Sequence, residues 1–531
     1  MFTHNLYIQK LFPLTKPEKY CIILTMVTKA ITAANIGINS CKIEVEVDVT
    51  NSLPSMSIVG LPDSAVSEAR ERVHSAIKNS GYTFPTSKVI VNLAPADIRK
   101  EGTNFDLPIA IGILKEEGIE IPNDLTVAFL GELSLDGSLR KINGVLPLVS
   151  GLKENGITTV FVPEENAKEA ALVQGINIYG AKHLADIVNH FADTPLTKTV
   201  VDINNYLEEN AKTDYTFDFK DVKGQQKAKK ALEIAAAGGH NILMSGSPGS
   251  GKTLMAKCLA SILPPLELQE ALELTKIYSV SGLLQNDNPL MTKRPYRAVH
   301  HTASQNGIIG GGSNPKPGEI TLAHRGVLFL DEMTEFPSQT LEVLRQPLED
   351  GEVVISRAKS SIKYPAKFML VGAMNPCPCG FLGDKEKDCT CSEYQIQRYR
   401  SKLSGPLLDR IDLVINVPRL TTEELINTKT EAETSAKIRE RVVKARKIQA
   451  ERYAKENIFT NSELNNKQIK KYCKIDEKTT EFLKIASQKY QLSGRKYDRI
   501  LKLARTIADL AESKNIEFEH VTLALQYRAE I

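Results

Sequence analysis

The chain has 531 residues, of which 42% are hydrophobic and 25% are charged, as is usual for globular proteins. This length exceeds what one hydrophobic core supports, so we expect about three domains. The formal net charge is only +3, from 67 basic and 64 acidic side chains, which excludes a strong global field that attracts nucleic acid. Any contact with nucleic acid must therefore come from a local basic patch.

The targeting and cysteine patterns predict a cytoplasmic protein without a membrane partner. The longest apolar run near the start, Cys21 to Val27, is too short to cross a bilayer, and no small-residue cleavage site follows it. Eight cysteines, four of them clustered, do not resemble a disulfide framework and suit a reducing compartment. Residues 1–25 are predicted to be an N-terminal extension, and translation can start at Met1 or at Met26.

Residues 26–192 show the pattern of an α+β unit. The segment from Cys41 to Val49 alternates apolar and charged residues, which predicts a half-buried strand. Residues 193–214 are polar and lack periodicity, which predicts a linker. The other elements expected in the α+β unit are helices at Ser64–Ser80 and Leu107–Leu114 and strands at Lys88–Leu93 and Val127–Leu130.

An octapeptide in the middle of the chain, GSPGSGKT, has the G-x-x-x-x-G-K-T spacing of a phosphate-binding P-loop. Glycines let backbone N–H groups converge on phosphate oxygens, and a strand at Asn241–Ser245 and a helix at Leu254–Leu263 give it the required context. Lys252 is expected to reach the β- and γ-phosphates, and Thr253 to offer its hydroxyl to Mg²⁺. The alternative is an ordinary glycine-rich turn. The residues expected to contact the nucleotide are Gly246, Ser247, Pro248, Gly249, Ser250, Gly251, Lys252 and Thr253.

A second apolar strand, GVLFLDE at Gly326–Glu332, ends in two carboxylates. We expect Asp331 to hold the Mg²⁺ shell and Glu332 to orient the attacking water. The alternative is a buried strand that ends in acidic turn residues. A further strand, Lys367–Ala373, precedes Asn375, whose amide is expected to contact the γ-phosphate or the water and which otherwise is a cap or turn residue.

Two arginines are candidates for contacting a nucleotide. Arg410 follows a short helix in SGPLLDRID, where its planar guanidinium could reach the nucleotide of a neighbouring subunit. Arg495 lies at the start of the helix expected at Lys496–Leu510. The alternative for each is a solvated surface arginine.

Four clustered cysteines directly follow Asn375. They form C-x-C, nine residues, and C-x-C, and four thiolates suit tetrahedral Zn²⁺. A metal would clamp a loop with too little apolar content to fold alone. A redox pair and free thiols remain as alternatives. The candidate zinc ligands are Cys377, Cys379, Cys389 and Cys391.

The order of the P-loop, GVLFLDE, AMNP, SGPLLDRID and SGRKYDRILKLARTIADL resembles the magnesium-chelatase-like AAA+ ATPases, and within them the ComM/YifB type. The resemblance runs from about Met26 to the C-terminus. It implies a multidomain fold with a Lon-protease-like α+β domain, an α/β P-loop core with a parallel sheet and an all-α lid. The implied bounds are 26–192 for the α+β domain, 215–420 for the core, 376–392 for a Cys-rich insert and 421–531 for the lid, which is the magnesium-chelatase C-terminal domain.

The resemblance also implies roles for the candidate residues and ATP with Mg²⁺ as ligands. The DVKGQ segment at Asp221–Gln225 is similar to the family's adenine-side segment. An arginine that acts in trans requires a ring, so a homo-hexamer is implied. By this likeness Lys252 and Thr253 are the Walker A residues, Asp331 and Glu332 the Walker B residues, Asn375 sensor 1, Arg410 the arginine finger and Arg495 sensor 2.

Two inserts resemble those of the helicase-related branch and are expected to face the pore: Gly307–Glu319 and the hairpin Glu352–Pro365. Arg357, Lys359 and Lys363 give the hairpin positive charge for gripping a phosphate backbone, and a merely solvated basic hairpin is the alternative. ComM-type proteins are associated with branch migration during integration of transforming DNA. The implied function is ATP-driven remodelling of single-stranded or branched DNA.

Two rival functions follow from the same likeness. A metal-chelatase motor subunit is disfavoured because the motor subunits it resembles lack the Lon-like unit and no D-x-S-x-S motif occurs here. A Lon-like protease is suggested by GITTVFVPEENAKEA at Gly156–Ala170. However, the positions of the family's serine and lysine fall on Asn104 and Leu146, which supply neither a nucleophilic hydroxyl nor an amine.

Overall fold

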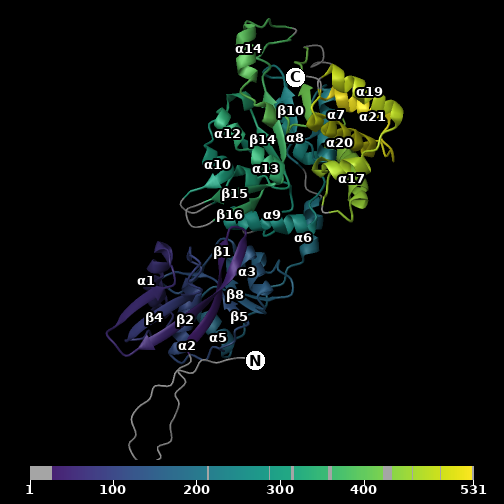
Figure 1. The fold of residues 1–531 in the computed structure, drawn as a ribbon. Coiled ribbons are helices and arrows are strands. Elements are labelled where there is room, and N and C mark those ends of the chain that lie inside the picture. Colours follow the sequence, from purple (N-terminus) through teal and green to yellow (C-terminus); the bar gives the residue numbers. More distant parts are fainter. Residues whose placement is uncertain are drawn as a thin grey trace, which may run out of the picture.

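The computed structural model describes residues 27–211, 215–285, 288–312, 316–356, 361–384, 386–421, 433–456, 458–490 and 492–528. The fold is multidomain and of the α/β type, with two separate main sheets. Figure 1 shows the first sheet, in purple and blue, at one end of the molecule and the second, in teal and green, further along. The last helices, in yellow, lie against one side of the second sheet (Figure 1). No helix within the described part of the chain is long and apolar enough to span a bilayer.

The N-terminal region is built on a mixed sheet with helices on both faces. Its strands are β1 (Thr28–Ile36), β2 (Asn39–Thr50), β3 (Ser55–Val59), β4 (Lys88–Ala94), β5 (Val127–Phe129), β8 (Thr159–Pro163) and β9 (Asn177–Ala181), with a small ribbon of β6 (Glu132–Leu133) and β7 (Leu139–Arg140). The strand order is β3-β4-β2-β1-β5-β8-β9. Strands β1, β2 and β4 pair antiparallel, and β1, β5, β8 and β9 pair parallel.

The predicted alternation in the second strand explains how this sheet packs. Ile43, Val45 and Val47 are buried, while Glu44 and Glu46 between them stay partly exposed. The three apolar side chains join the core under α1, α2 and α5, and a second core on the opposite face gathers α3 and α4. The helices of this region are α1 (Ser64–Asn79), α2 (Asp106–Glu116), α3 (Val145–Glu154), α4 (Glu164–Ala170) and α5 (Leu184–Phe191).

The second sheet is parallel throughout, and its strand order is β11-β14-β17-β10-β18. Its strands are β10 (Ile242–Ser245), β11 (Tyr296–Val299), β14 (Val327–Leu330), β17 (Met369–Met374) and β18 (Leu413–Asn416). The core on each face is formed by the short apolar strands and the helices that connect them. These helices are η1 (Phe219–Asp221), α7 (Gln226–Gly238), α8 (Lys252–Ile262), α9 (Leu268–Ser281), α10 (Gln305–Ile309), α11 (Glu319–Leu322), η2 (Met333–Glu335), α12 (Ser338–Glu342), α13 (Arg345–Asp350), α14 (Glu393–Arg400) and α15 (Gly405–Leu408).

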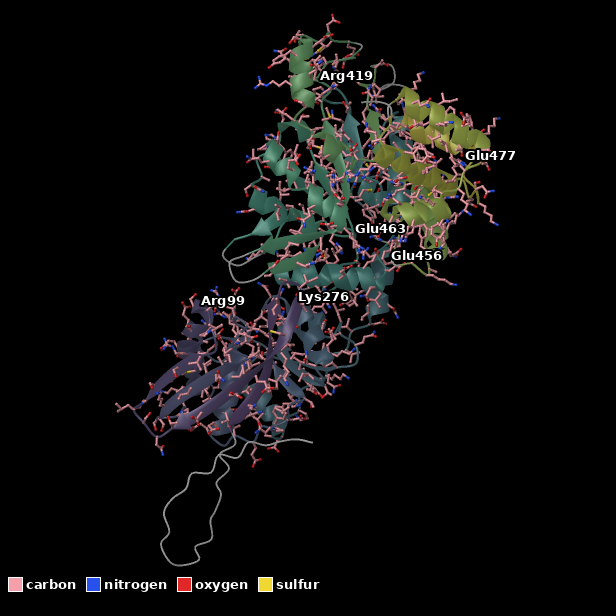
Figure 2. The ribbon with its side chains drawn as sticks, viewed as in Figure 1. Arg99, Lys276, Arg419, Glu456, Glu463 and Glu477 are labelled. Carbon is pink, nitrogen blue, oxygen red and sulfur yellow. The ribbon has the colours of Figure 1, made fainter. Side chains whose placement is uncertain are left out.

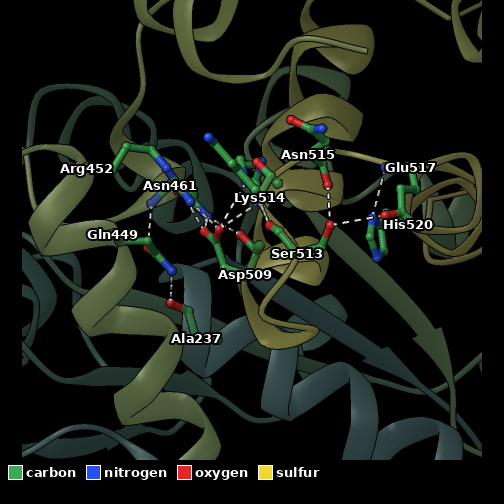
Figure 3. A network of polar contacts seen from close by, with 12 residues as sticks. Ala237, Gln449, Arg452, Asn461, Asp509, Ser513, Lys514, Asn515, Glu517 and His520 are labelled. Atoms are coloured by element: carbon green, nitrogen blue, oxygen red, sulfur yellow. Dashed lines mark hydrogen bonds and ion pairs between the residues drawn. The ribbon is translucent and has the colours of Figure 1, made fainter. Parts of the chain in front are cut away.

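After residue 433 the described elements are helices. Gln449 links them to the core, because its side chain donates to the Ala237 carbonyl at the end of α7 and accepts from the Asn461 amide (Figure 3). Asp509 lies at the centre of this network and accepts from Arg452 and Asn461. The helices are α17 (Ser435–Arg452), η3 (Asn461–Glu463), α18 (Asn466–Tyr472), α19 (Glu477–Lys489), α20 (Gly494–Leu510) and α21 (Phe518–Gln526).

A buried carboxylate joins the N-terminal region to the P-loop core. Glu169 of α4 is only 5% exposed, and it accepts hydrogen bonds from the Leu146 amide and from the Ser279 hydroxyl of α9. Burial raises the pKa of this carboxyl. The Gly144 amide donates to the Ser279 carbonyl beside it, at 3.1 Å. Helix α9, which carries Lys276, therefore forms the junction between the two regions (Figure 2).

The predicted linker at 193–214 requires a correction. It contains helix α6 (Ile203–Ala211), and Ile203 is buried in the same apolar cluster as residues of α9. The polar composition hid this helix because its buried contacts come from distant parts of the chain. The predicted extension at 1–25 lies outside the described residues.

Candidate functional site

The predicted P-loop connects β10 to α8, as its spacing requires. Gly249 and Gly251 have φ angles of +78° and +90°, in the region that favours glycine. Gly246 is needed for a different reason, since a Cβ there would lie 2.1 Å from the Val417 carbonyl oxygen. The turn leads directly into the N-terminus of α8, where the backbone N–H groups and the helix dipole favour an anion.

Lys252 is the first residue of α8 and is 9% exposed. Its Nζ donates to the carbonyls of Gly246 at 2.7 Å and Ser247 at 3.0 Å, so the ammonium lies inside the turn. Burial lowers the pKa of Lys252 to about 8, and the nearby carboxylates of Asp331 and Glu332 oppose this shift. The ammonium is therefore held in a place where an added anion would compensate its desolvation.

Three strand ends meet at the carboxyl edge of the second sheet. Strand β17 lies between β10 and β14, and all three run parallel, so the residues that follow them are neighbours. The Thr253 hydroxyl donates to Asp331 Oδ2 at 2.8 Å, and Lys252 Nζ donates to Asn375 Oδ1 at 3.4 Å. The structure thus brings together four of the residues that the sequence analysis selected, although they come from three separate segments.

Glu332 stands beside this group in a left-handed conformation, with φ of +49°. Its side chain is 54% exposed, and its Oε2 lies 3.3 Å from Nδ1 of His301. His301 is not among the residues predicted from the sequence. It follows β11, whose end lies next to the end of β14 in the sheet. Two adjacent histidines after a short strand were the signal that the sequence offered for this residue. The strand order alone indicates that the His301 ring faces Glu332.

Arg410 and Arg495 lie away from this group. Asn241, which precedes β10, donates its side-chain amide to the Arg410 carbonyl at 2.9 Å, so Arg410 lies at the opposite end of β10 from the P-loop. Arg410 is 8% exposed and forms an ion pair with Glu349. Burial lowers the pKa of Arg410, and the charges of Arg345, Arg495 and Arg499 lower it further. The two predicted arginines are therefore close to each other and distant from the P-loop of their own chain.

The four predicted cysteine ligands gather in one place. Their Sγ atoms all lie within 4.8 Å of one another. Cys377 Sγ is 3.3 Å from that of Cys379 and 3.7 Å from that of Cys389, and the Cys379 and Cys389 sulfurs are 3.6 Å apart. Backbone amides of Phe381 and Thr390 lower the pKa of Cys379 to about 6. Four cysteine sulfurs with backbone amide donors beside them are the donor chemistry of a structural zinc site.

Both predicted inserts form hairpins that touch each other. One pairs β12 (Gly310–Gly311) with β13 (Lys316–Pro317), and the other pairs β15 (Glu352–Ser356) with β16 (Ser361–Pro365). A Cβ on Gly310 would lie 3.0 Å from Ile355 Cδ1. The Lys363 side chain is 67% exposed and pairs with Glu352 at 2.8 Å. Arg357 and Lys359, the other two predicted DNA contacts, lie outside the described residues.

The structure also shows what occupies the two positions on which a protease interpretation depends. Asn104, at the position of the expected nucleophile, donates its side-chain amide to the Ala33 carbonyl at 2.9 Å. Leu146, at the position of the expected lysine, is buried against α9 residues such as Leu274. Both positions make structural contacts.

A P-loop at the end of one strand and an Asp-Glu pair at the end of another, with one parallel strand between them, define the class of P-loop proteins. Comparison with known families gives the particular group. The model described as "Magnesium chelatase, subunit ChlI" matches residues 218–425, "Subunit ChlI of Mg-chelatase" matches 45–166, and the ChlI C-terminal model matches 432–528.

Curated relatives extend the match to almost the whole chain. Competence protein ComM of Haemophilus influenzae is 44% identical over 502 residues, which are 94% of this chain and 96% of the relative. YifB of Escherichia coli K12, an uncharacterized protein, is 40% identical over 94% of this chain and 96% of its own length. The magnesium-chelatase 38 kDa subunit of Rhodobacter capsulatus is 28% identical and covers 31% of this chain and 52% of its own length. The chain belongs to the ComM/YifB family of magnesium-chelatase-like proteins.

Lys252 is expected to govern how polyphosphate binding depends on pH. The folded chain holds this amine at a pKa of about 8, below its ordinary 10.5, so the cost of burying the charge is complete below pH 8 and is lost progressively as the pH rises from 8 to 10.5. An anion that pairs with the ammonium is thus bound with constant affinity up to about pH 8, and about tenfold more weakly per unit above it. Titration with a fluorescent ATP analogue between pH 7.5 and 9.5 measures this.

The matched control for this experiment is Thr253→Ala, which is expected to weaken binding equally at every pH. Calorimetry in two buffers of different ionisation enthalpy should show proton uptake on binding near pH 9 for the parent chain. An affinity that stays constant to pH 9.5 would contradict the assignment of the shifted pKa to Lys252.

Proposed function

We propose that this protein is an ATP-hydrolysing ring motor that remodels DNA, with branch migration or helicase-type activity during recombination of transforming DNA. The observation that carries the proposal is the group of Lys252, Thr253, Asp331 and Asn375 at one edge of the sheet, with the Thr253 hydroxyl 2.8 Å from Asp331. This group has a cation for phosphates and hard oxygen atoms for a metal. It therefore supports nucleotide hydrolysis better than a purely structural role.

The donor set around Thr253 suits Mg²⁺. A hydroxyl and a carboxylate are hard oxygen ligands, and Mg²⁺ in proteins is bound by one or two such groups together with substrate phosphates. In this proposal Thr253 and Asp331 hold the ion, which neutralises charge that develops on the phosphates. Lys252 adds its ammonium, and the backbone N–H groups of residues 246–251 bind the phosphate oxygens.

Glu332 is proposed to orient the attacking water. Its carboxylate is 54% exposed, and the His301 ring at 3.3 Å limits its orientation. Asn375 lies beside Lys252 and is proposed to contact the γ-phosphate or the same water. The chain then supplies a positioned water, an in-line approach and a preorganised cation, which are the main requirements for phosphoryl transfer to water.

Arg410 and Arg495 support an assembly in which protomers share sites. Strand β10 has four residues and is about 13 Å long, so Arg410 at its amino end is beyond the reach of the nucleotide bound at its carboxyl end. A neighbouring protomer is therefore needed to use Arg410 in catalysis. We propose a homo-hexamer in which the arginine finger Arg410 and the sensor 2 residue Arg495 both contact the nucleotide of the next protomer.

The surface proposed to contact DNA is formed by the two inserted hairpins. They touch through Gly310 and Ile355, and Lys363 is exposed on one of them. The same hairpin lies against the N-terminal region, because a Cβ on Gly37 would be 2.7 Å from Ile362 Cγ2. We propose that both hairpins line the pore of the ring and grip the phosphate backbone without reading bases. The similarity to a competence protein supports DNA as the polymer.

Two rival functions receive less support. A magnesium-chelatase motor is suggested by the three family matches, but the chelatase subunit of Rhodobacter capsulatus covers only 31% of the chain, whereas ComM covers 94%. A Lon-like protease would need a serine and a lysine where Asn104 and Leu146 occur.

We also propose that Cys377, Cys379, Cys389 and Cys391 bind one Zn²⁺. Tetrahedral zinc with Zn–S bonds of about 2.3 Å separates its sulfur ligands by about 3.8 Å. The sulfur–sulfur separations of 3.3, 3.7 and 3.6 Å among Cys377, Cys379 and Cys389 approach this value, and all four sulfurs share the site. A disulfide pair would instead need two sulfurs in bonding contact and would leave the other two thiols without a role.

The first prediction from this function concerns Glu332. Glu332→Gln should bind ATP within about twofold of the parent and hydrolyse it at least ~100-fold more slowly, because the amide cannot polarise the water. Phosphate release at saturating ATP, together with binding of a fluorescent analogue, measures both quantities. Glu335→Gln, which alters an exposed carboxylate three residues further on, is the matched control and should behave as the parent. Equal turnover by Glu332→Gln and the parent would disprove the role.

The second prediction tests whether sites are shared. Lys252→Ala and Arg410→Ala should each be inactive alone, but mixing them should restore turnover at interfaces where one protomer supplies Lys252 and the next supplies Arg410. When the two variants are mixed in equal amounts and assemble at random, about a quarter of the interfaces have both Lys252 on one protomer and Arg410 on the next. Turnover is measured after mixing, and subunit exchange is verified with differently tagged chains. Mixed rings without any recovered activity would exclude action in trans.

The third prediction concerns DNA. ATP turnover should rise with single-stranded or four-way-junction DNA, and the protein should move a branched junction in an ATP-dependent manner. Arg357→Glu, Lys359→Glu and Lys363→Glu combined should reduce the stimulation and leave basal turnover unchanged, because these charges are proposed to contact phosphates only.

The control for the DNA experiment is Lys474→Glu with Lys478→Glu, two exposed lysines near α19. This variant should keep full stimulation. A parent protein that remains monomeric with nucleotide and is indifferent to every DNA offered would refute the motor.

A further inference from the structure

The cysteine cluster begins at the site where the P-loop is held to the sheet. Strand β17 ends at Met374, whose carbonyl accepts from the Gly246 amide at 3.2 Å. Asn375, which contacts Lys252, follows at once, and Cys377 is two residues further along the chain. A change in the position of the cysteine loop is therefore transmitted over a short and stiff stretch of backbone that includes Pro376.

The cysteine loop also packs directly on the P-loop turn. Gly380 has φ of +84°, and a Cβ there would lie 2.7 Å from Cδ of Pro248. The Gly380 amide donates to the Cys377 carbonyl at 3.0 Å, so a tight turn between the first two cysteines presses the Gly380 backbone against the Pro248 ring. The contact is close enough to exclude a methyl group.

A second contact lies further along the cysteine loop. The Asp384 carboxylate accepts from the backbone amides of Glu386 and Lys387, and Asp384 lines one small cavity together with Gly246 and Ser247 of the P-loop turn. Glu386 pairs with Arg419 after β18, at 3.6 Å. Figure 2 shows Arg419 at the end of the molecule that is remote from the N-terminal region. The loop thus packs on Pro248 and lies beside Ser247 of the turn.

The loop has few apolar contacts that would hold it there. Between residues 381 and 392, no side chain that the structure describes is buried. The charged pair Glu386–Arg419 is exposed and is worth little in water. The four thiols are therefore the main candidates for fixing the loop, and a metal bound by them would supply most of the ordering free energy.

We propose that zinc in the four-cysteine site holds the loop against Ser247 and Pro248, so that metal occupancy controls the affinity of the P-loop for nucleotide. This inference rests on the proposed zinc and nucleotide sites. The cluster is then a regulatory metal site as well as a clamp, because loss of zinc releases the loop and loosens the turn that is proposed to bind the phosphates.

Reversible removal of zinc from the full-length protein tests the proposal. The protein is stripped with a chelator under reducing conditions, desalted, and titrated with a fluorescent ATP analogue before and after one equivalent of Zn²⁺. Plasma mass spectrometry gives the metal content. The zinc-loaded chain should bind one zinc, and its nucleotide affinity should be about tenfold higher than that of the stripped chain. Readdition of zinc should restore the affinity.

Two glycines provide a matched pair that leaves the metal ligands untouched. Gly380→Ala should retain zinc and weaken nucleotide binding by about tenfold, because its Cβ displaces Pro248. Gly383→Ala carries the same positive φ, +76°, but a Cβ there meets nothing within 4 Å, so it should retain both zinc and affinity. Cys389→Ser should lose zinc and lose affinity, whereas Cys41→Ser, outside the cluster, should lose neither.

The outcomes separate the inference from the proposed function. Equal nucleotide affinity of the stripped and the loaded chain would overturn the coupling, and a reduced chain that cannot be loaded with zinc would overturn the metal site. A zinc-loaded chain that binds no nucleotide at all would contradict the proposed function itself, and the inference with it. Gly380→Ala and Gly383→Ala with the same affinity would also count against the contact with Pro248.

Discussion

The parallel pairing of β10, β17 and β14 is the constraint on which the candidate site depends. Because all three strands run in the same direction, the segments that follow them emerge at one edge, and an amide, a carboxylate, a hydroxyl and an ammonium meet there. Lys252 is buried in the turn among carbonyl oxygens, so its charge is only partly compensated. An anion placed against it would complete the site, which is why the geometry supports nucleotide binding more strongly than any single residue does.

The opposite end of the same sheet has different chemistry. Arg410 and Arg495 lie near each other there, and Asp412 binds Arg499 of α20 and the ring of His240. These contacts lower the pKa of the Asp412 carboxyl and fix the helical region to the core. One end of the protomer therefore carries the turn proposed to bind phosphates, and the other end carries a cluster of arginines in which Arg410 pairs with Glu349 and Arg499 with Asp412. A ring in which unlike ends meet would use both, as heterologous interfaces do.

The N-terminal region is coupled to this core by specific contacts. Glu169 accepts from Ser279 of α9, and Gly37 contacts the hairpin that carries Lys363. Helix α9 and the hairpin belong to the P-loop core, so two separate parts of the core pack against the N-terminal region. The proposed zinc site lies in the loop that precedes α14, which Figure 1 shows at the end of the core remote from the N-terminal region, and this loop contacts Pro248 of the P-loop. The core is thus in close contact with the N-terminal region at Gly37 and with the cysteine loop at Gly380, and neither glycine position leaves space for a side chain.

The sequence alone determined the local features of this protein. The P-loop, the acidic strand end, Asn375 and the four cysteines were predicted because each depends on spacing within one short segment, and the strands and helices around them follow the same short-range periodicity. Tertiary structure decided the rest. Helix α6, the contact of His301 with Glu332, the position of Arg410 and Arg495 away from their own P-loop, and the packing of Gly380 on Pro248 each join segments far apart in the chain. Such contacts depend on strand order and on how buried surfaces pack, and local periodicity carries no information about either.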